Sequence, residues 1–290
     1  MQYPYVILTD LSADIDRDLL VHKDIRLVPM SYTLGEEERV CDRPESDEAL
    51  RAFYNAQRRG EATRTAQVSQ QTYFDVFTPY AKEGVSILYL ALSSGLSSTY
   101  ASSVVVARQV MEKYPGVEIV CVDTLGATAG MGLLLEKAAL NRDQGMSVRE
   151  NAAWLEENRL RVCHWFMVDD LMYLRRGGRV SATTAVVGTA LNIKPVLKIL
   201  DDGTLSSFAK KRGTRAAVRH LLDLYAQSRE DAEDEHVYVL HADCPDNAEQ
   251  LRQGVMEISS AARVTVCMLT PIIGAHVGPG MCAIAHWGKR

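Results

Sequence analysis

A run of hydroxyl side chains over residues 93–100 (SSGLSSTY) directly follows the apolar segment 85–92 (VSILYLAL). Such a segment is typical of a central strand in a parallel sheet, where both faces are buried. Ligands bind just beyond the carboxyl ends of these strands. A helix that starts there also offers free N–H groups and a positive dipole end to an anion. The pattern predicts an anion site to which the hydroxyl of Ser93 or Ser94 adds a donor, or else a serine-rich cap that serves only the helix.

Two further segments carry groups suited to the same site. Thr65 precedes a predicted helix that begins at Ser69, so its hydroxyl is a second candidate donor, although Ser69 itself suits a helix cap. Residues 274–280 (GAHVGPG) form a predicted glycine-rich loop, in which the backbone can approach a ligand closely. His276 is the ionisable residue of that loop. It is a candidate for the site, or for a turn that faces solvent.

Two basic clusters lie in the second half of the chain, over residues 174–181 and 210–215. Either cluster could neutralise a phosphate or dock against an acidic surface of a partner. A solvated basic face is the alternative for each. The basic residues of interest are Arg176, Arg179, Lys211, Arg212 and Arg215.

Several enzyme signatures are absent from the sequence. It contains no G-x-S-x-G nucleophile elbow, no G-x-x-x-x-G-K-[ST] phosphate loop and no H-E-x-x-H or ligand-spaced Cys/His set. The glycines of residues 126–132 (GATAGMG) are in the wrong order for a dinucleotide loop, so we expect them to allow close helix packing. These absences argue against a hydrolase of that type, a P-loop kinase and a zinc enzyme.

The first half of the chain alternates apolar runs with helical stripes, which is typical of α/β architecture. Ser147 and Glu150 have capping-box spacing for a helix over 148–159, and we expect a domain boundary at its end. Residues 1–159 are therefore predicted to form a domain with a mainly parallel sheet flanked by helices. Its predicted strands span 6–9, 26–32, 85–92 and 117–122, and its other predicted helices span 47–59, 69–84, 97–114 and 125–142.

The second half, residues 160–290, is predicted to be a mixed α/β domain. Asp201-Asp202-Gly203 is a strong hairpin signal, and the lack of a regular βαβ order predicts a mixed sheet. Its predicted strands span 161–168, 196–200, 205–210, 236–241, 264–269 and 281–287. Its predicted helices span 169–176, 183–192, 215–227 and 247–259.

Composition narrows the class of protein. The chain has 290 residues and a net charge of −5, so it lacks the overall basic field that attracts nucleic acid. The six cysteines are scattered with no C-x-x-C pair, which favours reduced core cysteines and a reducing compartment. The sequence shows no secretory signal and no apolar stretch near the roughly 20 residues of a membrane span. We therefore expect a cytoplasmic protein without stable membrane insertion.

Taken in order, these segments resemble the DegV family over nearly the whole chain. Each matching motif is weak alone, but the set in register is specific. Three positions depart from the family pattern, namely Leu11, Ala66 and Ser98. The matching segments are 10–14 (DLSAD), 65–67 (TAQ), 93–100, 123–124 (DT), 174–181, 192–195 (NIKP) with 202–203, and 274–280.

The resemblance implies a two-domain protein that binds a long-chain fatty acid, such as palmitate or stearate, without a cofactor and without catalysis of its own. It implies that Thr65 and Ser94 hydrogen-bond the carboxylate, with the Gly95 N–H nearby and His276 at the entrance. The expected ligand-binding residues are Thr65, Ser93, Ser94, Gly95, Arg179 and His276.

The resemblance also implies a partner, a fatty acid kinase subunit that converts the carboxylate to an acyl phosphate. Arg176, Arg179 and the 210–215 cluster are then expected to face this kinase or its nucleotide. Two alternatives stay open. One is an acyl or phosphoryl transferase or hydrolase that uses Ser94 and His276, and the other is a lipid-sensing regulatory module that acts through the 210–215 cluster.

Overall fold

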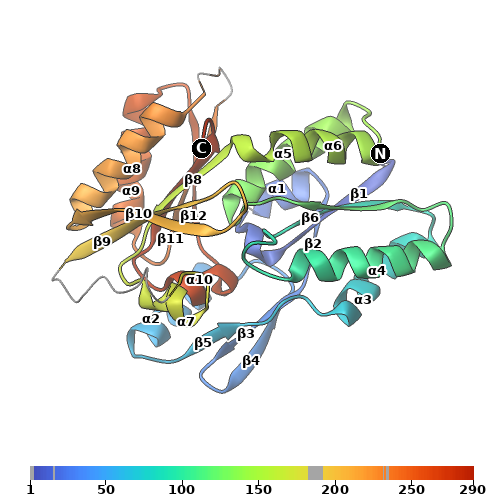
Figure 1. The fold of residues 1–290 in the computed structure, drawn as a ribbon, viewed down its shortest axis with the longest axis horizontal. Helices are drawn as coiled ribbons and strands as arrows, with labels where there is room; N and C mark the ends of the chain where they lie inside the picture. The colour runs from blue at the N-terminus through green and yellow to red at the C-terminus, as the bar shows by residue number, and fades with distance from the viewer. Residues whose placement is uncertain (1–2, 16, 182–191, 231, 233–234) are drawn as a thin grey trace.

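The computed structural model of the chain describes residues 3–15, 17–181, 192–230, 232 and 235–290. Within these residues the strands form sheets of four, six and three strands (Figure 1). The two larger sheets draw on separate halves of the sequence. The predicted boundary at residue 159 falls between them, and the division into two domains remains a prediction.

The four-stranded sheet is entirely parallel, with strand order β2-β1-β6-β7, as the sequence predicted. Its central strands are buried along almost their whole length, which explains why they appear as continuous apolar runs. Helices α5 and α6 lie above this sheet and α3 and α4 below it in Figure 1. The elements are β1 (Tyr5–Asp10), α1 (Arg17–His22), β2 (Ile25–Val28), α3 (Gln70–Lys82), β6 (Ser86–Ala91), α4 (Thr99–Lys113), β7 (Ile119–Asp123), α5 (Ala129–Asp143) and α6 (Val148–Asn158).

A small antiparallel sheet, with order β4-β3-β5, was not predicted. The single strand expected over 26–32 is wrong, because the chain divides at Pro29 between β2 of the parallel sheet and β3 of the small sheet. Proline lacks the N–H that a continuous ladder requires. The elements here are β3 (Met30–Leu34), β4 (Glu37–Cys41), α2 (Asp47–Arg58) and β5 (Thr63–Thr65).

The six-stranded sheet is mixed, as predicted, with order β10-β9-β8-β13-β11-β12. Only its β11–β12 pair is parallel. Helices α8 and α9 pack on it over a second apolar core. The elements are β8 (Val162–Met167), α7 (Met172–Arg176), β9 (Ile193–Ile199), β10 (Leu205–Arg212), α8 (Thr214–Ser228), β11 (His236–His241), α9 (Pro245–Ile258), β12 (Arg263–Met268) and β13 (Cys282–Trp287).

Two expectations about helices need separate comment. The helix expected over 183–192 falls outside the described residues, apart from Asn192 at its end. Within the described part of the chain, no helix is both long and apolar enough to cross a bilayer.

The predicted loop over residues 274–280 is largely wrong. Residues up to 277 belong to a helix, α10 (Pro271–Val277), and only the segment around Gly278 and Gly280 is loop, with φ of 71° and 85°. Pro271 at the first helical position suits a helix start, because its missing N–H is not needed there. Gly274 serves packing, since a Cβ at this position would lie 2.6 Å from the Tyr54 hydroxyl.

Side chains from the first half of the chain hold α10 at both of its ends. They bind backbone groups, so α10 is fixed relative to the parallel sheet and the small sheet. These hydrogen bonds are Thr270 N–H to Asp14 Oδ1 (2.7 Å), Tyr54 O–H to the Leu269 carbonyl (2.9 Å), Gln57 Nε2 to the Gly274 carbonyl (3.1 Å) and Thr63 O–H to the Ala275 carbonyl (3.2 Å).

The Asp14 carboxyl predicts a pH dependence of stability. Burial raises the pKa of Asp14 to about 8, against a value near 3.8 when unfolded. The folded state therefore holds this proton more tightly, and that contribution to stability is lost as pH rises through about 8. We expect Asp14→Asn, measured by urea unfolding, to lose less stability than the parent between about pH 6 and about pH 9. The exposed control Asp75→Asn should follow the parent, and an Asp14→Asn curve parallel to the parent would contradict the assignment.

Candidate functional site

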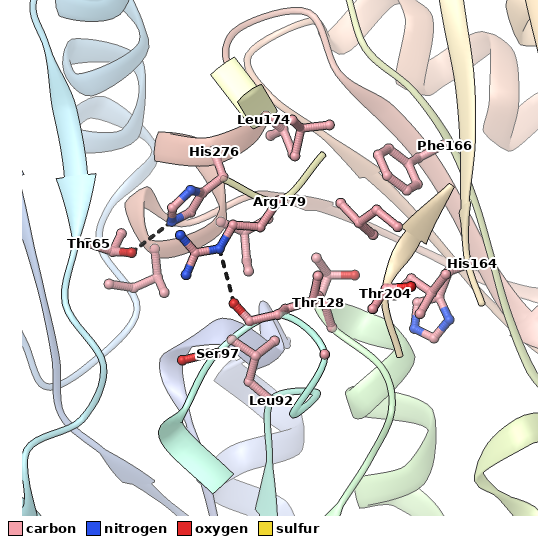
Figure 2. A pocket seen from close by; sticks show the side chains of 18 of the residues that line it. Thr65, Leu92, Ser97, Thr128, His164, Phe166, Leu174, Arg179, Thr204 and His276 are labelled. Carbon is pink, nitrogen blue, oxygen red and sulfur yellow. Dashed lines mark hydrogen bonds between the residues drawn. The ribbon is translucent and has the colours of Figure 1, made fainter. Parts of the chain in front are cut away.

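A cavity of about 850 Å³ lies between the two halves of the chain (Figure 2). The segments that follow β6 and β7 form one wall, which is where a parallel sheet places its ligands. The second half supplies the opposite wall from β8, β13 and α10. The apolar residues that line the cavity include Met30, Leu92, Leu96, Phe166, Leu174, Val180, Ile199, Leu205, Leu240, Ile272, Ile273, Val277, Met281 and Ala283.

The polar side chains of Thr65, Arg179 and His276 lie together at one side of this cavity (Figure 2). The Thr65 hydroxyl at the end of β5 lies 2.7 Å from His276 Nε2, on the last turn of α10. Arg179 lies beside them in Figure 2 and donates from Nε to the Leu96 carbonyl at 3.0 Å. We call Thr65, Ser94, Arg179 and His276, all of which line the cavity, the polar cluster.

His276 is held as a neutral imidazole. Burial, and then the positive charge of Arg179, lower the pKa of His276 to about 4. Its Nδ1 is buried and has no hydrogen-bond partner among the described residues. The ring packs directly on Gly177, where an added Cβ would collide with Nδ1. Gly177 therefore leaves room for the imidazole.

Ser93 and Ser94, in the loop after β6, have different roles. The Ser93 hydroxyl donates to the Gly203 carbonyl at 2.8 Å and accepts the Gly95 N–H at 3.1 Å. Ser93 is fully buried and is not among the residues that line the cavity. The structure thus places this predicted ligand-binding residue behind the wall, where it joins the loop to the 201–204 hairpin.

Ser94 and Gly95 are exposed on the cavity wall. The Ser94 N–H donates to Asp123 Oδ1 at 3.0 Å, while the Ser94 hydroxyl has no partner in the described part of the chain. The Gly95 N–H, which was expected to lie near a carboxylate, is already bonded to Ser93. A Cβ at Gly95 would lie 2.6 Å from the Gly203 carbonyl carbon, so only glycine fits.

The remaining basic residues of interest lie away from the cavity lining. Arg176 is exposed and its guanidinium stacks 4.6 Å from the Tyr173 ring. Lys211 and Arg212 end β10, and Arg215 follows in the first turn of α8. Within the residues described, none of these four side chains forms an ion pair.

Several polar lining residues were not predicted. His164 of β8 is buried and lines the cavity across from the polar cluster, together with Thr204 (Figure 2). Gly126 and Gly130 pack against the His164 ring, which confirms that these glycines serve close packing. Burial lowers the pKa of His164 to about 3. Strand alternation alone gives no signal for which buried side chain borders a cavity.

No metal site accompanies this arrangement. Among the residues that the structure describes, no group of three or more His, Cys, Asp and Glu side chains is placed to hold a metal ion. The polar cluster combines hydroxyls, a neutral imidazole and one guanidinium, a set suited to hydrogen-bonding an anion.

Residues 4–289 match the model of a family described as "Uncharacterised protein, DegV family". The chain belongs to the DegV family. A DegV domain-containing protein of Clostridium perfringens is 36% identical over 284 residues, which are 98% of this chain and 97% of that protein.

Solved DegV structures have the same fold. A DegV family protein from Thermus thermophilus, described by its fatty acid binding, is 27% identical with a TM-score of 0.85 and covers 98% of this chain and 99% of its own. A DegV lipid-binding protein from Thermotoga maritima is 25% identical with a TM-score of 0.84, covering 99% of both chains.

The environment of His276 predicts an unusual titration. Its folded pKa of about 4 lies below the value near 6.5 of an exposed histidine, so stability is lost as pH falls below 6.5 and through 4. We expect its imidazole resonances in NMR to titrate with a midpoint near 4, and the midpoint to rise in Arg179→Met because a positive charge is removed. His276→Gln assigns the signal. A midpoint at the ordinary value in the parent chain would show that the ring is solvated.

Proposed function

We propose that this chain binds a long-chain fatty acid with its tail in the cavity and its carboxylate at the polar cluster. The observation that carries the proposal is a cavity of about 850 Å³ that many apolar side chains line, together with the hydroxyl, imidazole and guanidinium groups of the polar cluster. The relatives of known structure support it, because one is described by its fatty acid binding and another as a lipid-binding protein. Palmitate and stearate are the expected types of ligand.

The apolar walls account for affinity. Each buried methylene contributes about 0.8 kcal/mol, so a long acyl chain gains on the order of 10 kcal/mol before the costs of association. The walls come from both halves of the chain, and the aliphatic side chains of α10 and β13 face those that follow β6. Binding of the acyl tail therefore requires that the two halves are packed against each other.

The polar cluster accounts for orientation. A buried carboxylate is costly unless donors and a counter-charge surround it. The Ser94 hydroxyl has no competing partner among the described residues. Thr65, at the end of β5, offers a second hydroxyl, and Arg179 supplies positive charge. His276 stays neutral near pH 7, so it acts as a hydrogen-bonding group and not as a second cation.

The contacts favour binding over catalysis by this chain. In the described part of the chain, His276 Nε2 contacts Thr65 and not Ser94, so no base is in place to activate the Ser94 hydroxyl. Asp123 accepts the Ser94 N–H, and no carboxylate among the described residues orients the buried His276 Nδ1. A serine–histidine–acid arrangement therefore lacks its defining hydrogen bonds.

We propose further that the bound carboxylate is presented to a separate kinase subunit in the cytoplasm. Arg176, Lys211, Arg212 and Arg215 provide positive charge outside the cavity without ion pairs inside the described region. Such charges speed the approach of an acidic partner. The six cysteines are spread along the sequence with no C-x-x-C pair, which is consistent with a reducing compartment.

Loss of the two hydroxyls should weaken binding of the carboxylate. Each hydrogen bond to a charged group contributes about 1.5–3 kcal/mol, so we expect Thr65→Val/Ser94→Ala to bind palmitate roughly 100-fold more weakly or worse in titration calorimetry. Thr33→Val/Ser102→Ala makes the same chemical changes away from the cavity lining and should bind like the parent. Equal affinity in both double variants would place the carboxylate elsewhere.

Charge reversal should separate binding from presentation. We expect Lys211→Glu/Arg212→Glu/Arg215→Glu to retain fatty acid but to lose most acyl-phosphate formation when a fatty acid kinase and ATP are supplied. Arg108→Glu/Arg149→Glu changes basic residues on other elements and is the control. Full activity of the triple variant would remove these residues from the partner surface.

A further inference from the structure

Two cysteines of the second half lie in direct contact. The Cys244 and Cys282 sulfurs are 3.2 Å apart, and both residues are free thiols. Cys282 is fully buried on β13, while Cys244, just before α9, is partly exposed. A partly exposed cysteine therefore lies against a second cysteine that is fully buried.

The sheet itself brings these sulfurs together. Cys282 is the register partner of His241, the last residue of β11 in its antiparallel pairing with β13. Asp243 then adopts a left-handed conformation with φ of 51°, which turns the chain back toward β13. This turn places Cys244 over the residue that pairs with His241.

Backbone hydrogen bonds fix the two segments to each other. The Ala242 N–H donates to the Met281 carbonyl at 2.9 Å, and the Gly280 N–H donates to the Ala242 carbonyl at 2.8 Å. The Cys244 thiol also contacts the Met281 carbonyl at 3.2 Å. The sulfur contact is therefore set by main-chain structure and not by two freely rotating surface side chains.

We propose that Cys244 and Cys282 form a redox-modification site that closes to an intramolecular disulfide when the protein meets a hydroperoxide. The Cys244 thiolate attacks a peroxide oxygen, the O–O bond breaks, and water or an alcohol leaves, which gives a sulfenic acid at Cys244. The Cys282 sulfur then attacks the Cys244 sulfur, the S–O bond breaks, and water leaves with the thiol proton. Two thiols are oxidised by two electrons and the peroxide is reduced.

The order of these steps follows from the surroundings of the thiols. Cys244 is the more exposed residue of the pair and reacts first. The hydrogen bond with Cys244 and burial raise the pKa of Cys282, so Cys282 remains a thiol until Cys244 is oxidised. Reversible disulfides of this kind are those found in reducing compartments.

The site lies next to the cavity. Met281 and Ala283, which flank Cys282 on β13, line the cavity wall. Asp243, which precedes Cys244, pairs with Arg58 of α2 in the first half, and Arg58 also donates to the Asp243 carbonyl at 2.9 Å. The disulfide would thus form between the cavity wall and a contact that joins the two halves.

Peroxide treatment of the full-length reduced protein tests the proposal. After quenching, denaturation and alkylation, the oxidised chain should take up two fewer alkyl groups than the reduced chain, which has six cysteines. Peptide mapping should show a link between Cys244 and Cys282 in monomeric protein. Cys267→Ser, a matched change on β12, should form the same link.

Trapping of the intermediate tests the order of steps. With Cys282→Ser, we expect a sulfenic acid at Cys244 that dimedone labels, and far weaker labelling there in the parent chain, where Cys282 consumes it. Full alkylation of the oxidised parent, a link between other cysteines, or a link between two chains would overturn the proposal. Equal dimedone labelling of parent and Cys282→Ser would overturn it as well.

Discussion

The position of α10 is the constraint on which the cavity depends. This short helix belongs to the second half of the sequence, yet hydrogen bonds from Asp14, Tyr54 and Gln57 of the first half hold its backbone. His276 stands on its last turn and meets Thr65 of β5. The polar cluster therefore exists only while the two halves are packed, because neither half contains both members of that contact.

The loop after β6 is also fixed by a few hydrogen bonds between the two halves and within the first half. A buried hydroxyl at Ser93 satisfies the Gly203 carbonyl and the Gly95 N–H, which fixes the loop against the hairpin of the second half. Asp123 fixes the Ser94 backbone from the neighbouring strand. Ser94 lines the cavity, and its hydroxyl has no hydrogen-bond partner among the described residues, so a ligand can engage it. Rigid support of this kind reduces the cost of ordering on binding.

Much of this architecture was predictable from the sequence, because strands buried on both faces appear as continuous apolar runs and the hydroxyl loop directly follows one of them. The fold class and the placement of Ser94 on a cavity followed from that pattern, whereas Thr65 was assigned to the same site by the resemblance to the DegV family. The prediction of a loop over 274–280 was wrong because Gly274 serves packing against Tyr54. The sequence does not distinguish a glycine that allows close packing from one that allows a turn. Lining residues such as His164 depend on how two sheets meet, which no local pattern encodes.

Carbon-13 NMR of palmitate labelled at its carboxyl carbon tests the central claim most directly, because it reports the environment of the carboxylate itself. The structure predicts a narrow bound resonance, distinct from free palmitate, that saturates at one equivalent and shifts when Ser94 is replaced by alanine. A broad resonance typical of palmitate aggregates, with no saturable bound signal, would contradict the account. So would a bound signal that is indifferent to changes at Ser94, Thr65 and Arg179.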